Sequence, residues 1–269
     1  MSVPTASEAV YLLHTGIPRG APGSDETTLR AIRKLPPLPS SPRILDIGCG
    51  PGRQTLLLAR AFNSRVAAVD TYQPFLDRLK EAAFRAGLTD LIETRNLSMD
   101  ALDYPPASID LIWSEGAVYI IGLWRPMLRR GGIVAFTGLT WLTDDRPAGA
   151  VEFWAKGYPE MTTTAGNVAK AKAEGYELLE TFTIPPEDWW NDFYKPLQAR
   201  IAILRSDCER NPDLAAVLDS TEQEINLYAR HGESFGYVFY LVQKSDGQAC
   251  QPVVRVAGPH PDCVPQSVT

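Results

Sequence analysis

From residue 43 onward, the pattern of apolar and polar residues alternates short apolar runs with amphipathic stretches. Residues 43–47, Arg-Ile-Leu-Asp-Ile, predict a short buried strand. Residues 73–86 predict a helix, because their apolar positions follow the 3.6-residue period. Further strands are predicted at 65–70, 91–96, 109–113, 132–139, 176–184 and 235–243, and further helices at 53–62, 118–128, 151–156, 165–174, 191–208 and 213–230. Strands that alternate with helices imply a parallel sheet covered on both faces.

The chain divides into three predicted parts. Residues 1–42 are rich in proline around one helix at 27–34, which Ser24 or Asp25 could cap, and form a helical lead-in segment. Residues 43–243 form the main domain, with a helical insertion at 186–232 before the last strand. The tail at 244–269 has little periodicity and is expected to be mobile, although Val253, Val254 and Val256 could pair as a short edge strand.

Charge disfavours nucleic acid as a partner. The chain has 26 Lys and Arg against 32 Asp and Glu, a net charge of -6, and so provides no broad cationic field. Arg125, Arg129 and Arg130 cluster at the end of the predicted helix 118–128 and directly after it, which we interpret as a solvated face.

A secretory signal is not expected, because the first residues contain no basic segment followed by an apolar run and Glu8 interrupts their apolar pattern. A membrane segment is not expected either, because the chain has no run of about 18 uninterrupted apolar residues. The four cysteines form no CxxC pair, and Cys49 lies inside a glycine-rich turn, so a reducing cytoplasm is the simplest location. Cys250, His260 and Cys263 lack the usual zinc spacing, and no metal site is predicted.

The strongest chemical signal is the strand that ends Leu-Asp-Ile and continues as Gly48-Cys49-Gly50-Pro51-Gly52 into a helix. Glycines let the backbone turn sharply and approach a ligand closely. The helix that follows directs its unpaired N–H groups into the same space. A dinucleotide fold would have GxGxxG, but Arg53 occupies the third glycine position, which disfavours a nicotinamide- or flavin-dependent oxidoreductase as the alternative.

The spacing is instead GxGxG, with Asp46 two residues before the first glycine. It resembles the first motif, (D/E)xGxGxG, of the class I S-adenosylmethionine-dependent methyltransferases, matched by Asp46, Gly48, Gly50 and Gly52. The resemblance implies a doubly wound α/β fold with a seven-stranded, mostly parallel sheet whose last strand is antiparallel. It also implies S-adenosylmethionine as cofactor, with its amino-acid part on this turn. The resemblance adds Ser24, Cys49, Gln54 and Thr71 to the expected cofactor contacts.

An acid at the end of the second strand is the next requirement, because a carboxylate can accept hydrogen bonds from both hydroxyls of a ribose. Asp70, twenty residues after Gly50, meets it. The alternative is an aspartate that caps the helix beginning at Gln73.

Residues 97–102 resemble the family's adenine-recognition loop. By that resemblance Asp100 would accept from the exocyclic amine, the N–H of Ala101 would meet a ring nitrogen, and Met99 would lie against the ring. A plain turn is the alternative.

Residues 109–116 resemble the family's fourth-strand motif, which ends beside the reactive methyl group. Glu115 is therefore a candidate catalytic residue that accepts a proton or binds a substrate amine, and Tyr119 is a second candidate. The alternative is that Glu115 has a structural role and only holds nearby loops in place. Together with Gly23-Ser24 and Trp141, this segment also resembles a group of bacterial small-molecule methyltransferases.

The predicted function is in-line transfer of a methyl group from S-adenosylmethionine to a small-molecule nucleophile. A cofactor-binding sensor without catalysis is an alternative, and a homodimer is left open. The insertion after Pro186 is the expected substrate cover, with aromatic candidates for pocket and lid at Tyr119, Trp124, Trp141, Trp154, Trp189, Trp190, Phe193 and Tyr194. His14 and His231 are candidate bases, but a lone histidine is more often structural and neither is assigned a role.

Overall fold

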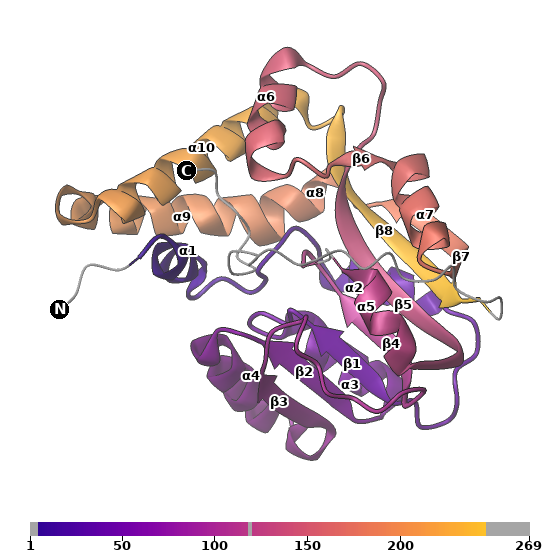
Figure 1. Cartoon of the computed structure of the whole chain (residues 1–269). Helices are drawn as coiled ribbons and strands as arrows, with labels where there is room; N and C mark the ends of the chain where they lie inside the picture. Colours follow the sequence, from indigo (N-terminus) through magenta and orange to yellow (C-terminus); the bar gives the residue numbers. More distant parts are fainter. Residues whose placement is uncertain (1–4, 118–119, 246–269) are drawn as a thin grey trace.

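The computed structural model describes residues 5–117 and 120–245. Its centre is one twisted sheet in the order β3-β2-β1-β4-β5-β8-β7 (Figure 1). The strands are β1 (Ile44–Ile47), β2 (Val66–Asp70), β3 (Ile92–Asn96), β4 (Ile109–Ser114), β5 (Leu128–Trp141), β6 (Thr162–Thr163), β7 (Tyr176–Thr183) and β8 (Phe235–Lys244). Strands β1 to β5 pair in parallel, β8 is antiparallel to both β5 and β7, and β6 pairs with the end of β5.

Alternate residues along the central strands enter different hydrophobic clusters, as the two-residue period of a strand requires. Ile44 and Leu111 lie in the cluster that also contains residues of α1, α3, α9 and α10. Leu45 and Ile112 lie in the cluster that also contains residues of α5 and α7. Because both faces are covered, all four residues of β1 are buried.

Helices surround this sheet on both sides (Figure 1). The α-helices are α1 (Ala6–His14), α2 (Asp25–Arg33), α3 (Arg53–Phe62), α4 (Gln73–Arg85), α5 (Ile121–Trp124), α6 (Ala148–Gly157), α7 (Thr164–Ala173), α8 (Pro186–Trp189), α9 (Lys195–Leu204) and α10 (Pro212–His231). Short 3₁₀ turns are η1 (Thr89–Leu91), η2 (Arg125–Met127) and η4 (Arg205–Arg210), and η3 (Trp190–Tyr194) is a π-helical turn.

The insertion between β7 and β8 contains the long pair α9 and α10, and α1 packs against both (Figure 1). Helix α1 therefore lies between the insertion and the sheet end that carries the glycine turn. This places the first and last helices of the described chain on the same side of the molecule.

The expected fold class is confirmed, including the antiparallel β8, the N-terminal helical segment and the helical insertion. The boundaries of the three predicted parts remain predictions. The tail from 246 onward, with Val253, Val254 and Val256, lies outside the described residues.

The predicted helix at 118–128 is wrong. Among residues 120–128, which the structure describes, the helical elements are only α5 and the 3₁₀ turn η2, and β5 begins at Leu128. Pro126 explains the difference, because inside an α-helix it would lose one hydrogen bond and clash with the preceding turn. Arg129 and Arg130 therefore lie on a strand, and Arg125 donates to the carbonyls of Gly175 and Ser245.

Helix α1 was not predicted. Its N-terminus is a capping box, in which the backbone N–H of Glu8 donates to Thr5 Oγ1 and the backbone N–H of Thr5 donates to Glu8 Oε2. The Thr-x-x-Glu spacing is a sequence signal for this motif. Glu8, interpreted as an interruption of the apolar pattern, is thus part of the helix start.

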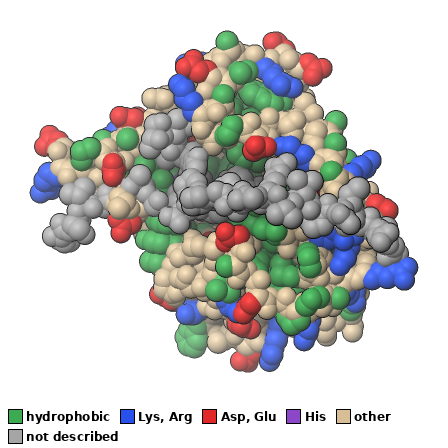
Figure 2. Space-filling view, viewed as in Figure 1, with side chains coloured by type: hydrophobic (Ala, Val, Ile, Leu, Met, Phe, Trp, Pro, Cys, Tyr) green, Lys and Arg blue, Asp and Glu red, His purple; other side chains and the backbone are tan. Residues whose placement is uncertain are grey.

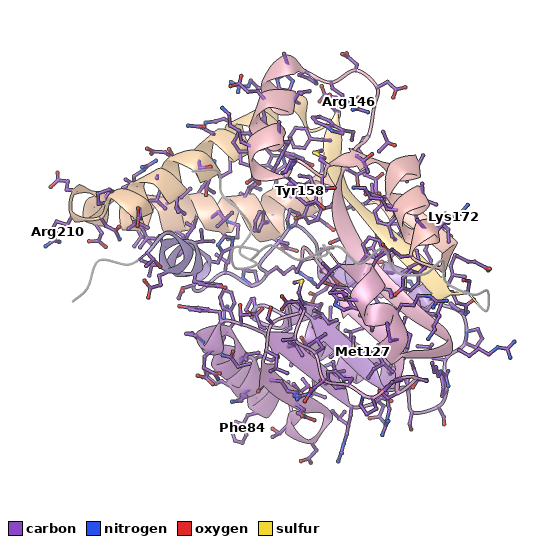
Figure 3. All side chains as sticks on the ribbon, in the orientation of Figure 1. Phe84, Met127, Arg146, Tyr158, Lys172 and Arg210 are labelled. Carbon is purple, nitrogen blue, oxygen red and sulfur yellow. The ribbon has the colours of Figure 1, made fainter. Side chains whose placement is uncertain are left out.

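Within 5–117 and 120–245, no helix is long and apolar enough to cross a membrane. Figure 2 shows acidic and basic side chains interspersed on the viewed face. Phe84 projects from the outer side of α4 and is 77% exposed (Figure 3).

Candidate cofactor and acceptor site

The turn between β1 and α3 has the left-handed conformation that its glycines permit. Gly48, Gly50 and Gly52 have φ angles of 67°, 52° and 82°. A Cβ atom at Gly52 would lie 2.3 Å from Leu79 Cδ1, whereas one at Gly50 would find its nearest atom, Gly20 N, at 3.9 Å. Gly52 therefore allows α3 to pack against α4, and Gly50 keeps the backbone open toward the adjacent cavity.

Most N–H groups of this turn have partners within the protein. Gly48 and Cys49 both donate to the carbonyl of Val69, Gly52 donates to the carbonyl of Cys49, and Gly50 donates to Asp70 Oδ2 at 2.8 Å. These bonds attach the turn to the end of β2. The N–H groups that the sequence predicts to face a ligand belong to the helix that follows, α3, and not to this turn.

Asp46 is fully buried behind the turn. Its Oδ2 accepts a 2.5 Å hydrogen bond from Thr55 Oγ1, which joins β1 to α3. Its Oδ1 has no hydrogen-bond partner among the described residues. Burial, with a smaller effect from the nearby Glu115 charge, raises the pKa of Asp46 to about 7.

Asp70 lies at the end of β2, as predicted. Its Oδ1 accepts from the N–H of Tyr72 at 2.9 Å and its Oδ2 from that of Gly50. Each carboxylate oxygen has a second lone pair, so this side chain can also accept from a ligand. Burial raises the pKa of Asp70, although the backbone N–H donors oppose the shift.

Helix α1 approaches the glycine turn through an aromatic contact. The rings of Tyr11 and Tyr72 stack with centroids 3.9 Å apart, and Phe75 meets both edge to face. Arg78 of α4 donates to the carbonyls of Gly16 and Ile17. The segment after α1 is therefore fastened against α4.

Glu115, after β4, is 9% exposed and accepts from three groups. Its Oε1 accepts from Thr28 Oγ1 at 2.8 Å and Trp113 Nε1 at 2.9 Å, and its Oε2 accepts from Arg19 Nη1 at 3.0 Å. Arg19 also donates to Asp25, which pairs with Arg53. A chain of alternating charges thus joins the end of β4 to α2 and α3.

A cavity opens above the turn and measures about 910 Å³ including its mouth. Its walls come from α1, the segment that follows, the glycine turn and the ends of β2, β3 and β4: Val10, Tyr11, His14, Arg19, Gly20, Ala21, Gly48, Cys49, Gly50, Gln54, Val69, Asp70, Thr71, Phe75, Leu97, Met99, Glu115, Gly116 and Ala117.

A second cavity, about 880 Å³ including its mouth, lies beside the first and shares Val10, His14, Gly20, Ala21 and Gly116 with it. Tyr158, labelled in Figure 3, follows α6 and lines it. The other lining residues come from α1, the segment between α1 and α2, β5, α6, the insertion and β8: Leu13, Pro22, Thr137, Gly138, Leu139, Trp154, Gly157, Trp189, Phe193, Leu197, Val217, Thr221, Glu224 and Tyr237.

The structure brings eight of the predicted site residues together on the first cavity: Gly48, Cys49, Gly50, Gln54, Asp70, Thr71, Met99 and Glu115. Asp46 and Gly52 support the turn from behind. Tyr119 lies outside the described residues.

Besides Asp46 and Gly52, three further predicted cofactor contacts do not line the cavity. Ser24 caps α2 and donates to Asp188 Oδ2 of the insertion. Asp100 and Ala101 are exposed, and the N–H of Ala101 donates to the carbonyl of Ser98. Their roles toward a cofactor remain predictions.

Sequence reasoning missed the contribution of α1 and the segment after it, which supply Tyr11, His14 and Arg19. The capping box at Thr5 was the available signal for the helix. Of the aromatic candidates, Trp154, Trp189 and Phe193 line the second cavity, whereas Trp124 and Trp141 are core.

Residues 44–131 match the family model described as a methyltransferase domain. Among curated proteins, 27-O-demethylrifamycin SV methyltransferase of Amycolatopsis mediterranei is 30% identical over 121 residues, which cover 41% of this chain and 44% of that protein. The chain spans about half the length of the curated relatives it matches first.

Two solved structures share the fold over most of the chain. An S-adenosylmethionine-dependent methyltransferase from Thiobacillus denitrificans, in complex with S-adenosylhomocysteine, has a TM-score of 0.72 at 17% identity, covering 90% of this chain and 99% of that chain. The [4+2]-cyclase SpnF has a TM-score of 0.70 at 20% identity, covering 92% and 98%. The chain therefore has the class I methyltransferase fold, and its residues 44–131 match the methyltransferase-domain model.

Proposed function

From this domain and fold, we propose that the protein transfers a methyl group from S-adenosylmethionine to a small-molecule nucleophile. The observation that carries the proposal is the glycine turn held by Asp70, with Asp70 also on the wall of the first cavity. A carboxylate at this position can accept hydrogen bonds from both hydroxyls of a ribose.

The residues of the first cavity fit this cofactor. Asp70 accepts from the ribose, Gly48 to Gly50 border the amino-acid part, and Leu97 and Met99 offer apolar surface to the adenine. The unpartnered Oδ1 of Asp46 lies behind the turn as an acceptor for the amino group or for a water bound to it. Bound S-adenosylmethionine would supply an electrophilic methyl group on its sulfonium.

The protein's own task is to hold the acceptor close and to exclude water. Glu115 accepts from three donors, so we assign it a positioning role: with Arg19 and Thr28 it fixes the segment after β4 against α2. The second cavity shares a boundary with the first, and we place the acceptor there.

The partner is a small molecule. The net charge of -6 and the mixed charges on the face in Figure 2 give no field for a nucleic acid. A cytoplasmic location and a homodimer remain predictions.

Calorimetry with S-adenosylhomocysteine tests the cofactor assignment. Asp70→Ala should weaken binding about 100-fold, since hydrogen bonds to a charged group contribute roughly 1.5–3 kcal/mol each. The control is Asp77→Ala, a 60% exposed side chain on α4, which should bind as the unchanged protein does. Undetectable binding to the unchanged protein would refute the proposal, and stabilisation by NAD(H) alone would favour an oxidoreductase.

A [4+2]-cyclase has the same fold, so cofactor binding must be followed by a measurement of methyl transfer. Labelled S-adenosylmethionine is incubated with the protein and a cell-extract metabolite pool. Label in a small molecule indicates an enzyme, and binding without transfer indicates a sensor.

A further inference from the structure

His14 lies where the two cavities meet. It is one of the five residues that line both, and it is the titratable one among them. The side chain is 7% exposed and belongs to the last turn of α1.

One ring nitrogen of His14 is fixed by the helix itself. Nδ1 lies 2.9 Å from the carbonyl oxygen of Val10. A carbonyl oxygen only accepts, so Nδ1 carries the proton and Nε2 of the neutral ring is an acceptor. Nε2 is buried and has no hydrogen-bond partner within the described ranges. Burial also lowers the pKa of His14, which favours this neutral form near pH 7.

Aromatic side chains form part of the walls of the second cavity. They include Trp154, Tyr158, Trp189, Phe193 and Tyr237. The indole N–H groups of Trp154 and Trp189 are buried and lack partners among the described residues. Residues that line this cavity therefore supply flat apolar surfaces, two unpaired indole donors and, at His14, one unpaired acceptor.

The carboxylic acid of this cavity, Glu224, is already engaged. Its Oε1 accepts from Tyr194 Oη at 2.9 Å. Burial raises the pKa of Glu224 to about 7, which indicates that a charged group is unfavourable in this cavity. A molecule with an aromatic ring, a hydroxyl donor and additional acceptor oxygens matches these walls better than a permanently charged one.

We propose that the second cavity binds a hydroxylated aromatic methyl acceptor and that His14 Nε2 accepts the proton of its reacting hydroxyl. The inference rests on the proposed function. The hydroxyl oxygen forms the new bond to the methyl carbon, the bond from sulfonium sulfur to that carbon breaks, and its electron pair stays on sulfur. The hydroxyl proton passes to Nε2 and then to solvent.

A base is needed because a phenolic hydroxyl has a pKa of about 10, so only about one molecule in a thousand is ionised at pH 7. A positioned proton acceptor contributes typically about 10²–10⁴-fold in such a step. The transfer rate should rise as His14 loses its proton and then level off.

Other titratable groups also face the boundary between the cavities. Tyr11, Arg19, Cys49, Asp70 and Glu115 line the first cavity, and Tyr158, Glu224 and Tyr237 line the second. Arg19 and Glu115 pair with each other, and burial raises the pKa of the Cys49 thiol. The pH profile must therefore be compared with that of a variant without His14.

His14→Asn is the most informative variant, because the asparagine amide nitrogen can replace Nδ1 as donor to Val10 while Nε2 is lost. His231→Asn, in the last turn of α10 and on neither cavity wall, is the matched control. The probes are phenol, 2-naphthol and a flavonol, with glycine and sarcosine as amines for comparison. Labelled S-adenosylmethionine measures transfer to each.

The unchanged protein should methylate at least one phenolic probe. His14→Asn should lower kcat about 100-fold or more and lose the acidic limb of the pH profile. Its affinity for S-adenosylhomocysteine should stay within about threefold. Added imidazole should partly restore the rate of His14→Ala. His231→Asn should behave as the unchanged protein does.

Each other outcome has a defined meaning. No binding of S-adenosylhomocysteine to the unchanged protein refutes the proposed function itself. Binding without transfer to any phenolic probe, or transfer to glycine or sarcosine alone, overturns the acceptor class. An unchanged kcat and pH limb in His14→Asn overturns the role of the base. If that variant fails to bind S-adenosylhomocysteine, His14→Gln is measured by the same criteria.

Discussion

Arg19 and Glu115, 96 residues apart in the sequence, form a buried ion pair in which Nη1 lies 3.0 Å from Oε2. The side chains are 4% and 5% exposed. Both charges have further partners, Asp25 for Arg19 and the donors Thr28 and Trp113 for Glu115. The pair thus ties the segment after α1 to the end of β4, beside the first cavity.

Arg19→Met should lower the free energy of unfolding by about 3–5 kcal/mol, because Glu115 would remain buried without its counter-charge. Urea unfolding measures the loss. The double variant Arg19→Met with Glu115→Gln should recover part of it, since the unpaired charge is then absent. Arg33→Met is the control: its pair with Glu26 is 60% and 75% exposed, and its loss should stay below about 1 kcal/mol. A similar loss in both single variants would contradict the buried pair.

Gly52→Ala should destabilise the fold more than Gly87→Ala. Both glycines have positive φ angles, 82° and 67°, so both substitutions incur left-handed backbone strain of about 1–2 kcal/mol. Only at Gly52 would the new Cβ also meet Leu79, at 2.3 Å, whereas nothing lies within 4 Å at Gly87. The overpacking should add about 1–3 kcal/mol, measured by thermal or urea unfolding. In the background of Leu79→Ala, itself a core truncation, Gly52→Ala should cost only the backbone strain, because the overpacking contact is absent. Equal losses at both glycines would count against the contact.

Sequence reasoning reached the local parts of the fold. The helix predicted at 53–62 has those bounds in α3, because strand, glycine turn and helix are encoded by neighbouring residues. The packing of helix α1 was missed because its buried residues, Ala9, Val10 and Leu13, belong to a cluster with α9 and α10. A local sequence pattern does not indicate packing partners so far away in the chain.

The candidate site likewise has a part that the local sequence predicts and a part that depends on packing between distant segments. The strand ends placed Asp70 and Glu115 at one edge of the sheet, because parallel strands bring their carboxyl ends together. Two partners of Glu115, Arg19 and Thr28, lie before α2 and on α2. Their positions depend on how the N-terminal segment packs against the sheet, which the sequence around β4 does not determine. His14 likewise acquires its surroundings only when α1 packs against the insertion.

The capping box of α1 should affect ligand binding as well as helix stability. Thr5→Ala should remove about 1 kcal/mol of helix stability and speed hydrogen exchange in α1. Because Tyr11 lines the first cavity from this helix, the affinity for S-adenosylhomocysteine should fall by up to about fivefold. Thr163→Ala is the matched control, because Thr163 caps α7, which contributes no residue to either cavity. Thr163→Ala should speed hydrogen exchange in α7 and leave the affinity for S-adenosylhomocysteine unchanged. An equal loss of affinity in both variants would argue against a specific effect of the α1 cap on ligand binding.

Glu224→Gln should change how stability depends on pH. Burial raises the folded pKa of Glu224 from 4.5 to about 7, so the folded state prefers the protonated acid. The stability that this group contributes is fully present below about pH 4.5 and is lost as pH rises through about 7. Glutamine is neutral throughout, so urea unfolding should show the variant gaining stability over the unchanged protein between these values and holding that gain above them. The hydrogen bond from Tyr194 lowers the same pKa. Tyr194→Phe should therefore make the pH dependence of the unfolding free energy steeper. If the unfolding free energies of Glu224→Gln and the unchanged protein differ by the same amount at every pH, Glu224 ionises as an ordinary surface acid.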